Sequence, residues 1–437
     1  MSRELRFDGR VALVTGAGRG LGRSHARLLA SRGAKVVVND LGSSTSGGGR
    51  SSEAAAQVVD EIRADGGEAI VNTDSVEDGD RIVAAAMEAW GRLDIVINNA
   101  GILRDKAFHN LSVEDWDLVY RVHVLGAFRV THAAWPILRE QGYGRVIMTA
   151  SSAGLYGNFG QANYAMAKLG LVGLSNTLAL EGQRRGILCN VVAPFAKSQL
   201  TEGVIPEHVF DALDPEHVSP LVARLVHEGS EVTGGVFEVG GGYFSQLRWE
   251  RSGGKAFRLG RPIRIEQIDR HWEDIARFDE RSEHPANVIE SMAPIVANID
   301  AGPSRGGNDL IDVDTALAAE LPELHSRYDE RDLALYALGI GAAKDPTAPD
   351  ALRYVYELHQ DGMKAMPTYA VLPALNAVLS AAREGRSIPG LNYGFDRLLH
   401  GEQYTELTRP LPLSAELTQQ IANTAHQDAN ELAKLFR

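Results

Sequence analysis

Cysteine, long apolar runs and excess positive charge are all lacking in this chain of 437 residues. With Cys189 as its only cysteine, it can form no intramolecular disulfide, which fits a reducing compartment. Cys189 lies in an apolar stretch, where a buried structural thiol is expected. No run approaches the roughly 18 apolar residues of a membrane span. The formal net charge of −13 opposes nucleic-acid binding, so neither a membrane span nor a nucleic-acid partner is expected.

We find no recognisable targeting signal at either end of this sequence. Residues 1–6 are largely polar or charged and lack the apolar core of a signal peptide. The last residues do not form a Ser-Lys-Leu peroxisomal signal. We therefore expect a soluble, cytoplasmic protein.

Short β-branched runs alternate with helix-like segments between residue 10 and about residue 245. This order predicts right-handed βαβ units in an α/β fold with a Rossmann-like, doubly wound parallel sheet. The expected strands are Val11–Val14, Lys35–Asn39, Ala69–Val71, Asp94–Asn98, Arg145–Met148, Ile187–Val192 and Gly235–Val239.

The remainder of the chain does not continue this alternation. Helical patterns beyond residue 250 are not needed by the sheet, and we interpret them as an extension that covers this domain or its partner subunit in a homodimer. The best linker candidate is Ala301-Gly302-Pro303-Ser304-Arg305-Gly306-Gly307-Asn308. The expected division is a Rossmann domain over 1–250, a helical extension over 251–300, a linker over 301–322 and a smaller α+β domain over 323–437.

A glycine-rich turn, Thr15-Gly16-Ala17-Gly18-Arg19-Gly20-Leu21-Gly22, follows the first expected strand and opens a helix. Glycine lets the backbone approach a pyrophosphate, which then lies at the helix N-terminus. The same sequence is compatible with a simple tight turn, but its place directly after a strand favours dinucleotide binding.

Asp40 ends the second expected strand, about 20 residues beyond the glycines, where a carboxylate can accept from ribose hydroxyls and repel a 2′-phosphate. Arg19 argues the other way, because a basic residue in the turn can hold a phosphate. The nearer carboxylate favours NAD as the cofactor. Turn chemistry alone is the alternative role of Asp40.

Polar residues also follow the third and fourth expected strands. Asp74 and Ser75 are placed to meet an adenine, although Ser75 can equally cap the following helix. Asn98-Asn99-Ala100-Gly101 ends the fourth strand, where the amides can tie strands together and the small residues leave room for a ribose. Both roles stay open.

Tyr164 and Lys168 are four residues apart and therefore share one face of a helix. Ser151 follows the fifth expected strand, and its spacing to Tyr164 favours it over the rival Ser152. A nearby cation stabilises phenolate and lowers the pKa of the tyrosine from about 10. Such a phenol can take a hydroxyl proton while hydride leaves for a nicotinamide. Ser151, Tyr164 and Lys168 are thus the candidate catalytic residues.

These motifs resemble the short-chain dehydrogenase/reductase family over residues 7 to about 245. Two stretches look more particularly like the dehydrogenase unit of multifunctional enzymes of type 2: Tyr156-Gly157-Asn158-Phe159-Gly160-Gln161-Ala162-Asn163-Tyr164 and Leu247-Arg248-Trp249-Glu250-Arg251. The resemblance implies oxidation of a (3R)-hydroxyacyl-CoA in fatty-acid β-oxidation. It also implies a set of cofactor contacts: Gly16, Arg19, Gly20, Leu21, Gly22, Asp40, Asp74, Ser75, Asn99, Tyr164 and Lys168.

One residue departs from the family pattern. His123 stands where many short-chain dehydrogenases have an asparagine that supports a proton-relay water. It can support such a relay or simply pack within a helix, and packing is slightly favoured.

The C-terminal part resembles the first half of the hydratase of the same enzymes, a double hot-dog fold. Tyr328 to Asp345, Met366-Pro367-Thr368-Tyr369 and Leu399-His400-Gly401-Glu402-Gln403-Tyr404 carry this likeness. The half with the hydratase's catalytic Asp and His motif does not appear, so hydratase activity is not expected. Beyond Pro412 the likeness fades, and Leu417, Ile421, Ala425, Leu432 and Phe436 recur at helical spacing, which predicts a helix.

Three functions are compatible with these patterns. The leading one is an NAD-dependent 3-hydroxyacyl-CoA dehydrogenase. A short-chain reductase for another alcohol, ketone or acyl-carrier thioester is the second. An inactive thioester-binding scaffold is the third, and the intact Ser, Tyr and Lys argue against it.

Overall fold

The computed structural model describes residues 4–197, 207–307, 310–319, 323–383, 389–391 and 405–419. The chain forms two compact units, Met1–Trp249 and Glu250–Arg437. The four-part division expected from the sequence stays a prediction. No helix among the described residues is long and apolar enough to cross a membrane.

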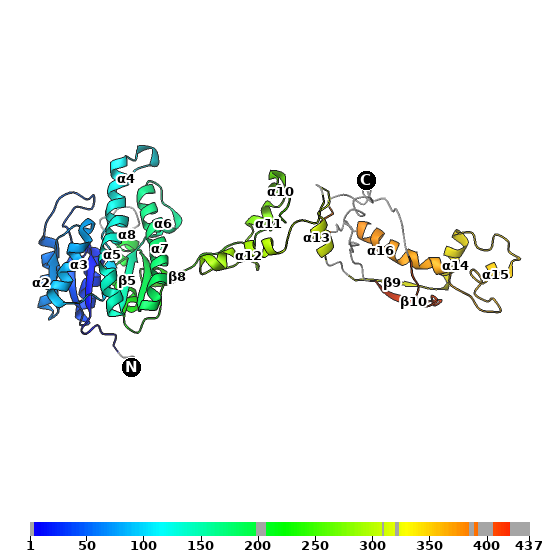
Figure 1. The fold of residues 1–437 in the computed structure, drawn as a ribbon, viewed down its shortest axis with the longest axis horizontal. Helices are drawn as coiled ribbons and strands as arrows, with labels where there is room; N and C mark the ends of the chain where they lie inside the picture. The colour runs from blue at the N-terminus through cyan, green and yellow to red at the C-terminus, as the bar shows by residue number, and fades with distance from the viewer. Residues whose placement is uncertain are drawn as a thin grey trace. The chain divides into compact units, whose positions relative to one another are not determined.

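The first unit is built on a twisted sheet with strand order β3-β2-β1-β4-β5-β6-β7-β8 (Figure 1). Neighbouring strands from β3 to β7 run parallel, and β8 alone pairs antiparallel. The chain therefore reverses its direction across the sheet between β3 and β4, which is the doubly wound order expected from the sequence. The strands are β1 Val11–Thr15, β2 Lys35–Asn39, β3 Glu68–Asn72, β4 Ile95–Asn98, β5 Gly144–Thr149, β6 Ile187–Pro194, β7 Val236–Gly240 and β8 Tyr243–Leu247.

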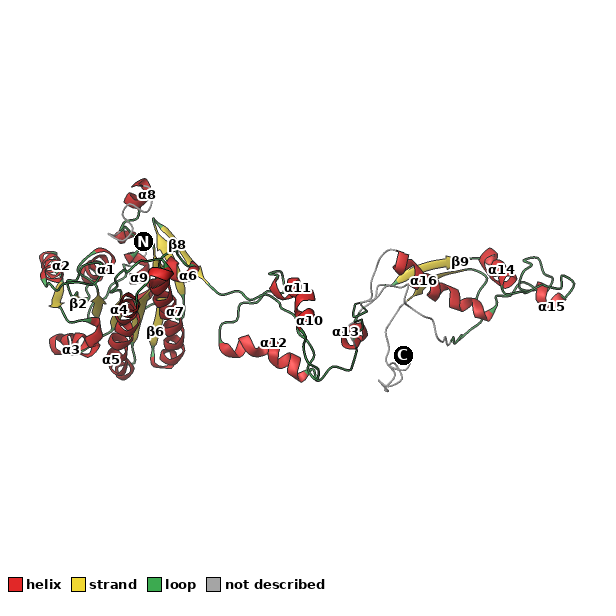
Figure 2. Ribbon diagram, turned by 90° about the horizontal axis from the view of Figure 1, so that it is seen from above, coloured by secondary structure: helices red, strands yellow, loops and turns green. Residues whose placement is uncertain are grey.

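Helices cover both faces of this sheet (Figure 2). Their bounds are α1 Gly20–Ser31, α2 Glu53–Ala64, α3 Gly79–Trp90, α4 Val113–Tyr120, α5 Gly126–Gln141, α6 Ser152–Tyr156, α7 Ala162–Gly182, α8 Glu207–Ala212 and α9 Ser219–Val226. Short 3₁₀ turns occupy Val76–Asp78, Phe108–Asn110, Gln183–Arg185 and Pro215–His217, and a π-turn over Arg121–Leu125 joins α4 to α5.

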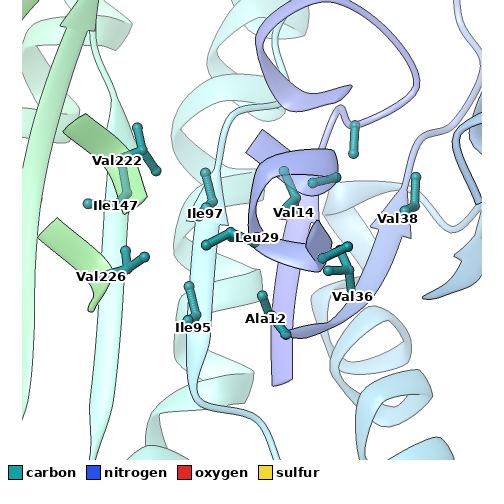
Figure 3. Packing of buried hydrophobic residues seen from close by; sticks show 14 of the residues in the cluster. Ala12, Val14, Leu29, Val36, Val38, Ile95, Ile97, Ile147, Val222 and Val226 are labelled. Atoms are coloured by element: carbon teal, nitrogen blue, oxygen red, sulfur yellow. The ribbon is translucent and has the colours of Figure 1, made fainter. Parts of the chain in front are cut away.

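Two apolar layers hold the sheet between its helices. On one face, Val14, Val36 and Ile97 pack against Leu29 of α1 and Val222 of α9 (Figure 3). The opposite layer joins the sheet to α3, α5 and α7. Because the strands are buried on both faces, they read as continuous apolar runs in the sequence, which is why they could be found there.

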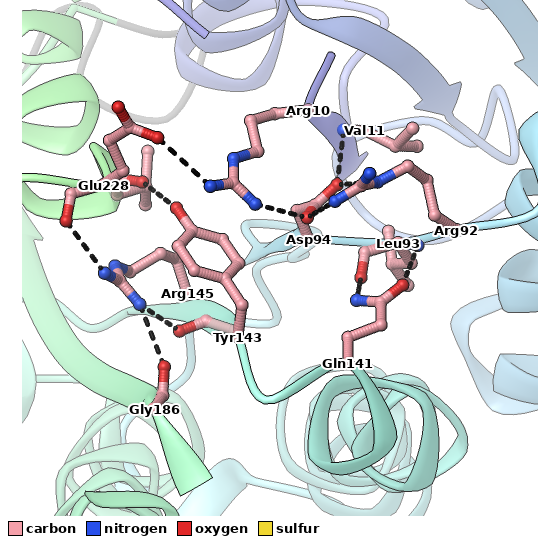
Figure 4. A network of polar contacts seen from close by, with 12 residues as sticks. Arg10, Val11, Arg92, Leu93, Asp94, Gln141, Tyr143, Arg145, Gly186 and Glu228 are labelled. Atoms are coloured by element: carbon pink, nitrogen blue, oxygen red, sulfur yellow. Dashed lines mark hydrogen bonds and ion pairs between the residues drawn. The ribbon is translucent and has the colours of Figure 1, made fainter. Parts of the chain in front are cut away.

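A charged cluster closes the end of the sheet where the strands begin (Figure 4). Asp94 is fully buried and pairs with Arg10 at 3.0 Å and Arg92 at 2.6 Å, and it accepts from the Val11 N–H at 2.9 Å. The Tyr143 ring has the Arg10 guanidinium at 3.8 Å and the Arg145 guanidinium at 4.3 Å from its centroid. These contacts satisfy a carboxylate that would otherwise be costly to bury.

The second unit contains shorter elements and a two-stranded antiparallel sheet, consistent with part of a hot-dog fold. Its elements are α10 Ile265–Arg270, α11 Trp272–Ala276, α12 Val288–Asp300, α13 Val313–Ala318, β9 Leu324–Tyr328, α14 Glu330–Gly339, α15 Pro349–Leu352, a 3₁₀ turn over Pro367–Ala370, α16 Val371–Arg383 and β10 Ala415–Gln419. Tyr328, Leu333, Met363 and Tyr369 form its apolar cluster.

The prediction of a helix after Pro412 is wrong for the first residues of that segment. Leu417 lies in β10, opposite Ser326 of β9. Alternation along this strand was overlooked because the wider spacing of apolar residues also fits a helix. Residues Ile421, Ala425, Leu432 and Phe436, and the Leu399 to Tyr404 motif, lie outside the described residues.

Candidate active site

The glycine-rich turn connects β1 to α1 and is packed tightly on one side only. A side chain at Gly16 would come within 2.7 Å of the Ala100 backbone, and one at Gly22 within 2.2 Å of the Gly16 carbonyl. Gly20 has φ of +52° and faces open space. The turn therefore needs glycine for its own shape and leaves exposed backbone at the N-terminus of α1, where a phosphate can bind.

Asp40 follows β2 and lies against this turn. Its carboxylate accepts from the Gly18 N–H at 2.8 Å and from the Gly42 N–H at 2.7 Å. Both contacts come from the backbone, so part of its role is turn chemistry. They also hold the carboxylate beside the glycine turn, where the sequence predicts a contact with a ribose. Arg19 and Leu21 belong to the same turn; Arg19 is exposed and Leu21 packs partly against the core.

Asn99, Asp74 and Ser75 all make structural contacts at strand ends. The Asn99 side chain donates to the carbonyls of Thr15 and Gly16, both at 3.1 Å, and so ties β4 to β1. Asp74 accepts from the Asn72 side chain at 2.8 Å. Ser75 caps the 3₁₀ turn that precedes α3 by accepting from the Glu77 N–H. Contact of these three residues with a cofactor stays a prediction.

Ser151, Tyr164 and Lys168 meet at the C-terminal end of β5. Ser151 follows this strand and caps α6, accepting from the Ala153 N–H at 3.2 Å. Tyr164 and Lys168 lie in the first turns of α7, with the Lys168 Nζ 5.5 Å from the centre of the Tyr164 ring. The Lys168 ammonium donates to the Thr149 carbonyl at 2.7 Å. The C-terminal end of β5 thus brings together three residues that are separated in the sequence.

Burial dominates the electrostatics of this site. It raises the pKa of Tyr164, while a hydrogen bond with Ser151 lowers that pKa by a smaller amount. Burial also lowers the pKa of Lys168 to about 7. The sequence predicts that Lys168 and a nicotinamide cation together lower the pKa of the phenol. In the protein without cofactor that pKa is instead raised, because burial has the largest effect on it.

His123 lies in the π-turn beneath Tyr164. Its buried ring meets the Tyr164 ring edge-on, with centroids 5.3 Å apart, and its Nε2 is 2.9 Å from the Ile102 nitrogen and 2.8 Å from the Ile102 oxygen. Burial lowers its pKa to about 3, so the ring is neutral at physiological pH. Its Nδ1 is buried without a protein partner among the described residues. His123 is therefore packed as expected, and one ring nitrogen stays open to a water-mediated contact.

Asn163 and Thr15 are site residues to which the sequence analysis gave no role. Asn163 is fully buried and directly precedes Tyr164. The Thr15 hydroxyl accepts from the N–H groups of Asn99 and Ala100 at 3.0 and 3.1 Å. Asparagine is a weak helix former, and its position in the first turn of a helix was the signal for a local hydrogen bond.

The geometry fits a nicotinamide dinucleotide. The open side of the glycine turn offers donors to a pyrophosphate, and Asp40 offers acceptors to a ribose. The three candidate catalytic residues lie at the end of β5, which neighbours β4, the first strand after the strand order reverses. Ligands bind at such switch points in open α/β sheets. No cluster of metal-binding side chains occurs among the residues described.

Two family profiles match the chain. The short chain dehydrogenase profile matches residues 10–204, and the profile of the MFE-2 hydratase 2 N-terminal domain matches residues 326–433. The second match extends well past Pro412, where the likeness was expected to fade. The expected loss of likeness beyond Pro412 is therefore wrong.

The chain is similar to several characterised proteins. It is 47% identical to mouse peroxisomal multifunctional enzyme type 2 over 95% of this chain, but spans only 57% of that relative. It is 43% identical to the Drosophila melanogaster enzyme of the same name, covering 67% of it. A Mycobacterium tuberculosis protein described as a putative short-chain type dehydrogenase/reductase is 47% identical, with 61% of this chain and 93% of that protein covered.

Solved structures give the same likeness. The full-length Drosophila multifunctional enzyme type 2 matches with a TM-score of 0.60 and 39% identity, over 95% of this chain and 67% of that chain. A Mycobacterium avium short chain dehydrogenase matches with a TM-score of 0.50 and 39% identity, over 68% of this chain and 96% of that chain.

The relatives overturn the expected cellular location. Those from mouse, Drosophila, Neurospora crassa and Saccharomyces cerevisiae are all described as peroxisomal. The expectation of a cytoplasmic protein is therefore wrong, and the relatives point to the peroxisome instead. The absence of one C-terminal signal does not determine where a protein is located.

Proposed function

The chain belongs to the short-chain dehydrogenase family, and from this membership we propose that it transfers hydride between NAD and a (3R)-hydroxyacyl-CoA of fatty-acid β-oxidation. The observation that carries the proposal is the meeting of Ser151, Tyr164 and Lys168 at the C-terminal end of β5, in a unit whose glycine turn is suited to a dinucleotide. The choice of substrate draws on relatives named as multifunctional and hydratase-dehydrogenase enzymes.

In the proposed reaction, Tyr164 takes the proton of the C3 hydroxyl as the C3–H bond breaks and its hydride leaves. When bound, a nicotinamide would supply the hydride acceptor and, in its oxidised form, a positive charge that would offset the effect of burial on the pKa of Tyr164. Ser151 donates a hydrogen bond to the substrate oxygen, and Lys168 holds the nicotinamide ribose and stabilises the phenolate.

NAD is the proposed cofactor rather than NADP. The Asp40 carboxylate is fixed by two backbone N–H groups and would repel a 2′-phosphate at the position of the adenosine ribose. The proposed cofactor contacts are Gly16, Arg19, Gly20, Leu21, Gly22, Asp40, Asp74, Ser75, Asn99, Tyr164 and Lys168.

The second unit is proposed to support thioester binding or assembly rather than hydration. The matched hydratase profile is that of an N-terminal domain. We further propose that the chain acts as a homodimer, and that residues 251–300, 301–322 and 323–437 serve as extension, linker and partial hot-dog domain.

The decisive experiment is a side-by-side NADH absorbance assay with (3R)- and (3S)-hydroxyacyl-CoA. We expect NAD reduction with the (3R) isomer, a preference for NAD over NADP, and much slower turnover of simple secondary alcohols. Faster turnover of other alcohols would assign the chain to another reductase activity. Binding of acyl-CoA without any NAD reduction would favour a scaffold, and release of a hydratase product from enoyl-CoA would refute the assignment of the second unit.

A further inference from the structure

We propose that Asn163 is a positioning residue that fixes the backbone of Tyr164, and with it the place of the phenol. The inference rests on the proposed dehydrogenase function, because it concerns the residue assigned there as the base. Asn163 would act through the backbone of Tyr164 and would contact neither substrate nor cofactor.

Both the oxygen and the nitrogen of the Asn163 side-chain amide form hydrogen bonds. Its Oδ1 accepts from the Tyr164 N–H at 2.8 Å, and its Nδ2 donates to the Arg104 carbonyl at 3.1 Å and to the Asp115 carbonyl at 3.5 Å. The side chain is fully buried. Turning the amide over would set its oxygen against two carbonyls, so the partners determine its orientation.

The start of α7 needs this contact. The N–H groups in the first turn of a helix have no partner within the helix, and a side chain at the N-cap usually supplies one. Gln161 occupies the N-cap of α7 but makes no capping hydrogen bond. Asn163 supplies the partner instead, and the N–H that it satisfies belongs to Tyr164 itself.

The segment that Asn163 contacts, residues 104–115, forms several other polar contacts. Asp115 of α4 pairs with Lys106 at 2.7 Å and with Arg104 at 3.4 Å. The Gln161 side chain donates to Asp105 at 2.7 Å, and the Lys106 N–H donates to the Gly160 carbonyl at 2.8 Å. Asn163 thus anchors the Tyr164 backbone to a segment that is also held by other polar contacts.

The position of the phenol depends on this anchor. From the other side, the ring edge of Tyr164 meets His123, which in turn is bonded to Ile102. Since the ring is held by contacts on its backbone and on its edge, loss of the backbone contact lets it shift against Ser151. A displacement of about 1 Å in a reacting group can cost roughly 10²-fold in rate.

The test compares Asn163→Leu with Asn190→Leu in the full chain. Asn190 is a matched control, since it is also buried, donates to the Val232 carbonyl at 2.7 Å and accepts from the Gly235 N–H at 3.0 Å. Leucine is neutral, so it adds no charge that could itself move the pKa of Tyr164, whose neighbours include Lys168, Asp105, Ser151 and His123. Asn163→Ser serves as a milder variant if the leucine variant does not fold.

We expect the Asn163 variants to lower kcat by roughly 10- to 100-fold, with unchanged NADH affinity and a pH midpoint for kcat moved upward. Asn190→Leu should lose stability but keep the kcat and the midpoint of the parent. Unchanged kcat and midpoint in the Asn163 variants would overturn the proposal. The same changes in kcat and pH midpoint in Asn190→Leu would also overturn the proposal, because the two substitutions would then report general destabilisation.

A substrate-free measurement separates this inference from the proposed function. The alkaline titration of Tyr164 is obtained as the absorbance difference between a protein and the same protein carrying Tyr164→Phe. A shifted Tyr164 titration in Asn163→Leu supports the positioning role even if no hydroxyacyl-CoA is oxidised. An unshifted titration overturns it even if the parent enzyme is active.

Discussion

The two units of this chain bury their apolar side chains in different ways. In the first, the strands are covered on both faces, and Leu13, Ile95 and Ile97 are fully buried. In the second, the described part has a small cluster around Tyr328 and Leu333, while α12 exposes 83% of Ile289 and 58% of Ile295. The first unit thus has a complete core, whereas the second leaves much apolar surface uncovered.

This difference indicates that the first unit carries the chemistry, whereas the second offers surfaces for assembly. A doubly covered sheet can fix the position of side chains at its strand ends, and all the candidate catalytic residues lie there. Exposed apolar helix faces are typical of surfaces that a partner covers. We therefore expect redox chemistry to depend on the first unit alone, and four changes can break or sharpen this comparison.

The largest effect is expected for Tyr164→Phe. Loss of the phenol proton acceptor should reduce NADH production by about 10³-fold, because general acid–base catalysis contributes on that scale. Cofactor affinity should survive, as the ring itself is retained. Steady-state kinetics and NADH fluorescence titration measure the two quantities. Substantial residual NADH production would mean that the base, or a second redox site, lies elsewhere.

A pair of core substitutions separates the stabilities of the units. Leu29→Ala in α1 and Leu333→Ala in α14 each empty a buried site and should cost about 2–5 kcal/mol in free energy of unfolding. Calorimetry of the full chain should show that Leu29→Ala lowers the transition that abolishes activity. Leu333→Ala should lower a different transition and leave kcat unchanged. One shared transition, lowered by both, would show that the units fold as one.

Acid should act on the first unit selectively, since His25 and His123 are the buried histidines of the described chain. Burial lowers the pKa of His25 to about 4, well below the unfolded value near 6.5. Its contribution to stability is therefore complete above pH 6.5 and is lost as the pH falls from 6.5 towards 4. About 2 kcal/mol should disappear by pH 5.

The His25 effect is measured as the slope of the free energy of unfolding against pH. His25→Gln removes the titrating group and should flatten the slope of the first unit, while His132→Gln, an exposed control, should not. Identical slopes in His25→Gln and the parent would contradict the prediction.

The smallest change is expected for Asp40→Ala. Removing the carboxylate should reduce the preference for NAD over NADP by roughly tenfold, or about 1.4 kcal/mol. The ratio of kcat/KM for the two cofactors measures it. Asp65→Ala, on an exposed helix end, is the matched control. An unchanged ratio in Asp40→Ala would leave Asp40 with turn chemistry only.

The fold of the first unit can be predicted from the sequence for a physical reason. A parallel sheet covered on both faces needs continuous apolar strands, so Val11 to Val14 and Ile187 to Val192 could be recognised directly. The glycine turn and the Ser151, Tyr164 and Lys168 spacing are equally local. By contrast, the edge strand β8 was missed because its exposed residues, such as Tyr243, do not form such a run.

Other features depend on contacts that spacing does not reveal. Asn163 acts through carbonyls at residues 104 and 115, and the direction of the Lys168 ammonium depends on the Thr149 carbonyl. Leu417 was assigned to a helix because its strand partner, Ser326, lies 91 residues earlier. Each case involves partners distant in sequence, which periodicity cannot supply.

The charged cluster around Asp94 has a consequence for the lifetime of the protein. It closes the sheet at the end opposite to Tyr164, so a change such as Asp94→Asn would weaken the fold without touching the reacting groups. Cells remove unfolded chains continuously, and a loss of 1–2 kcal/mol can alter abundance several-fold. Variation at this distant end would thus set how much enzyme is present, while each surviving molecule works at its usual rate.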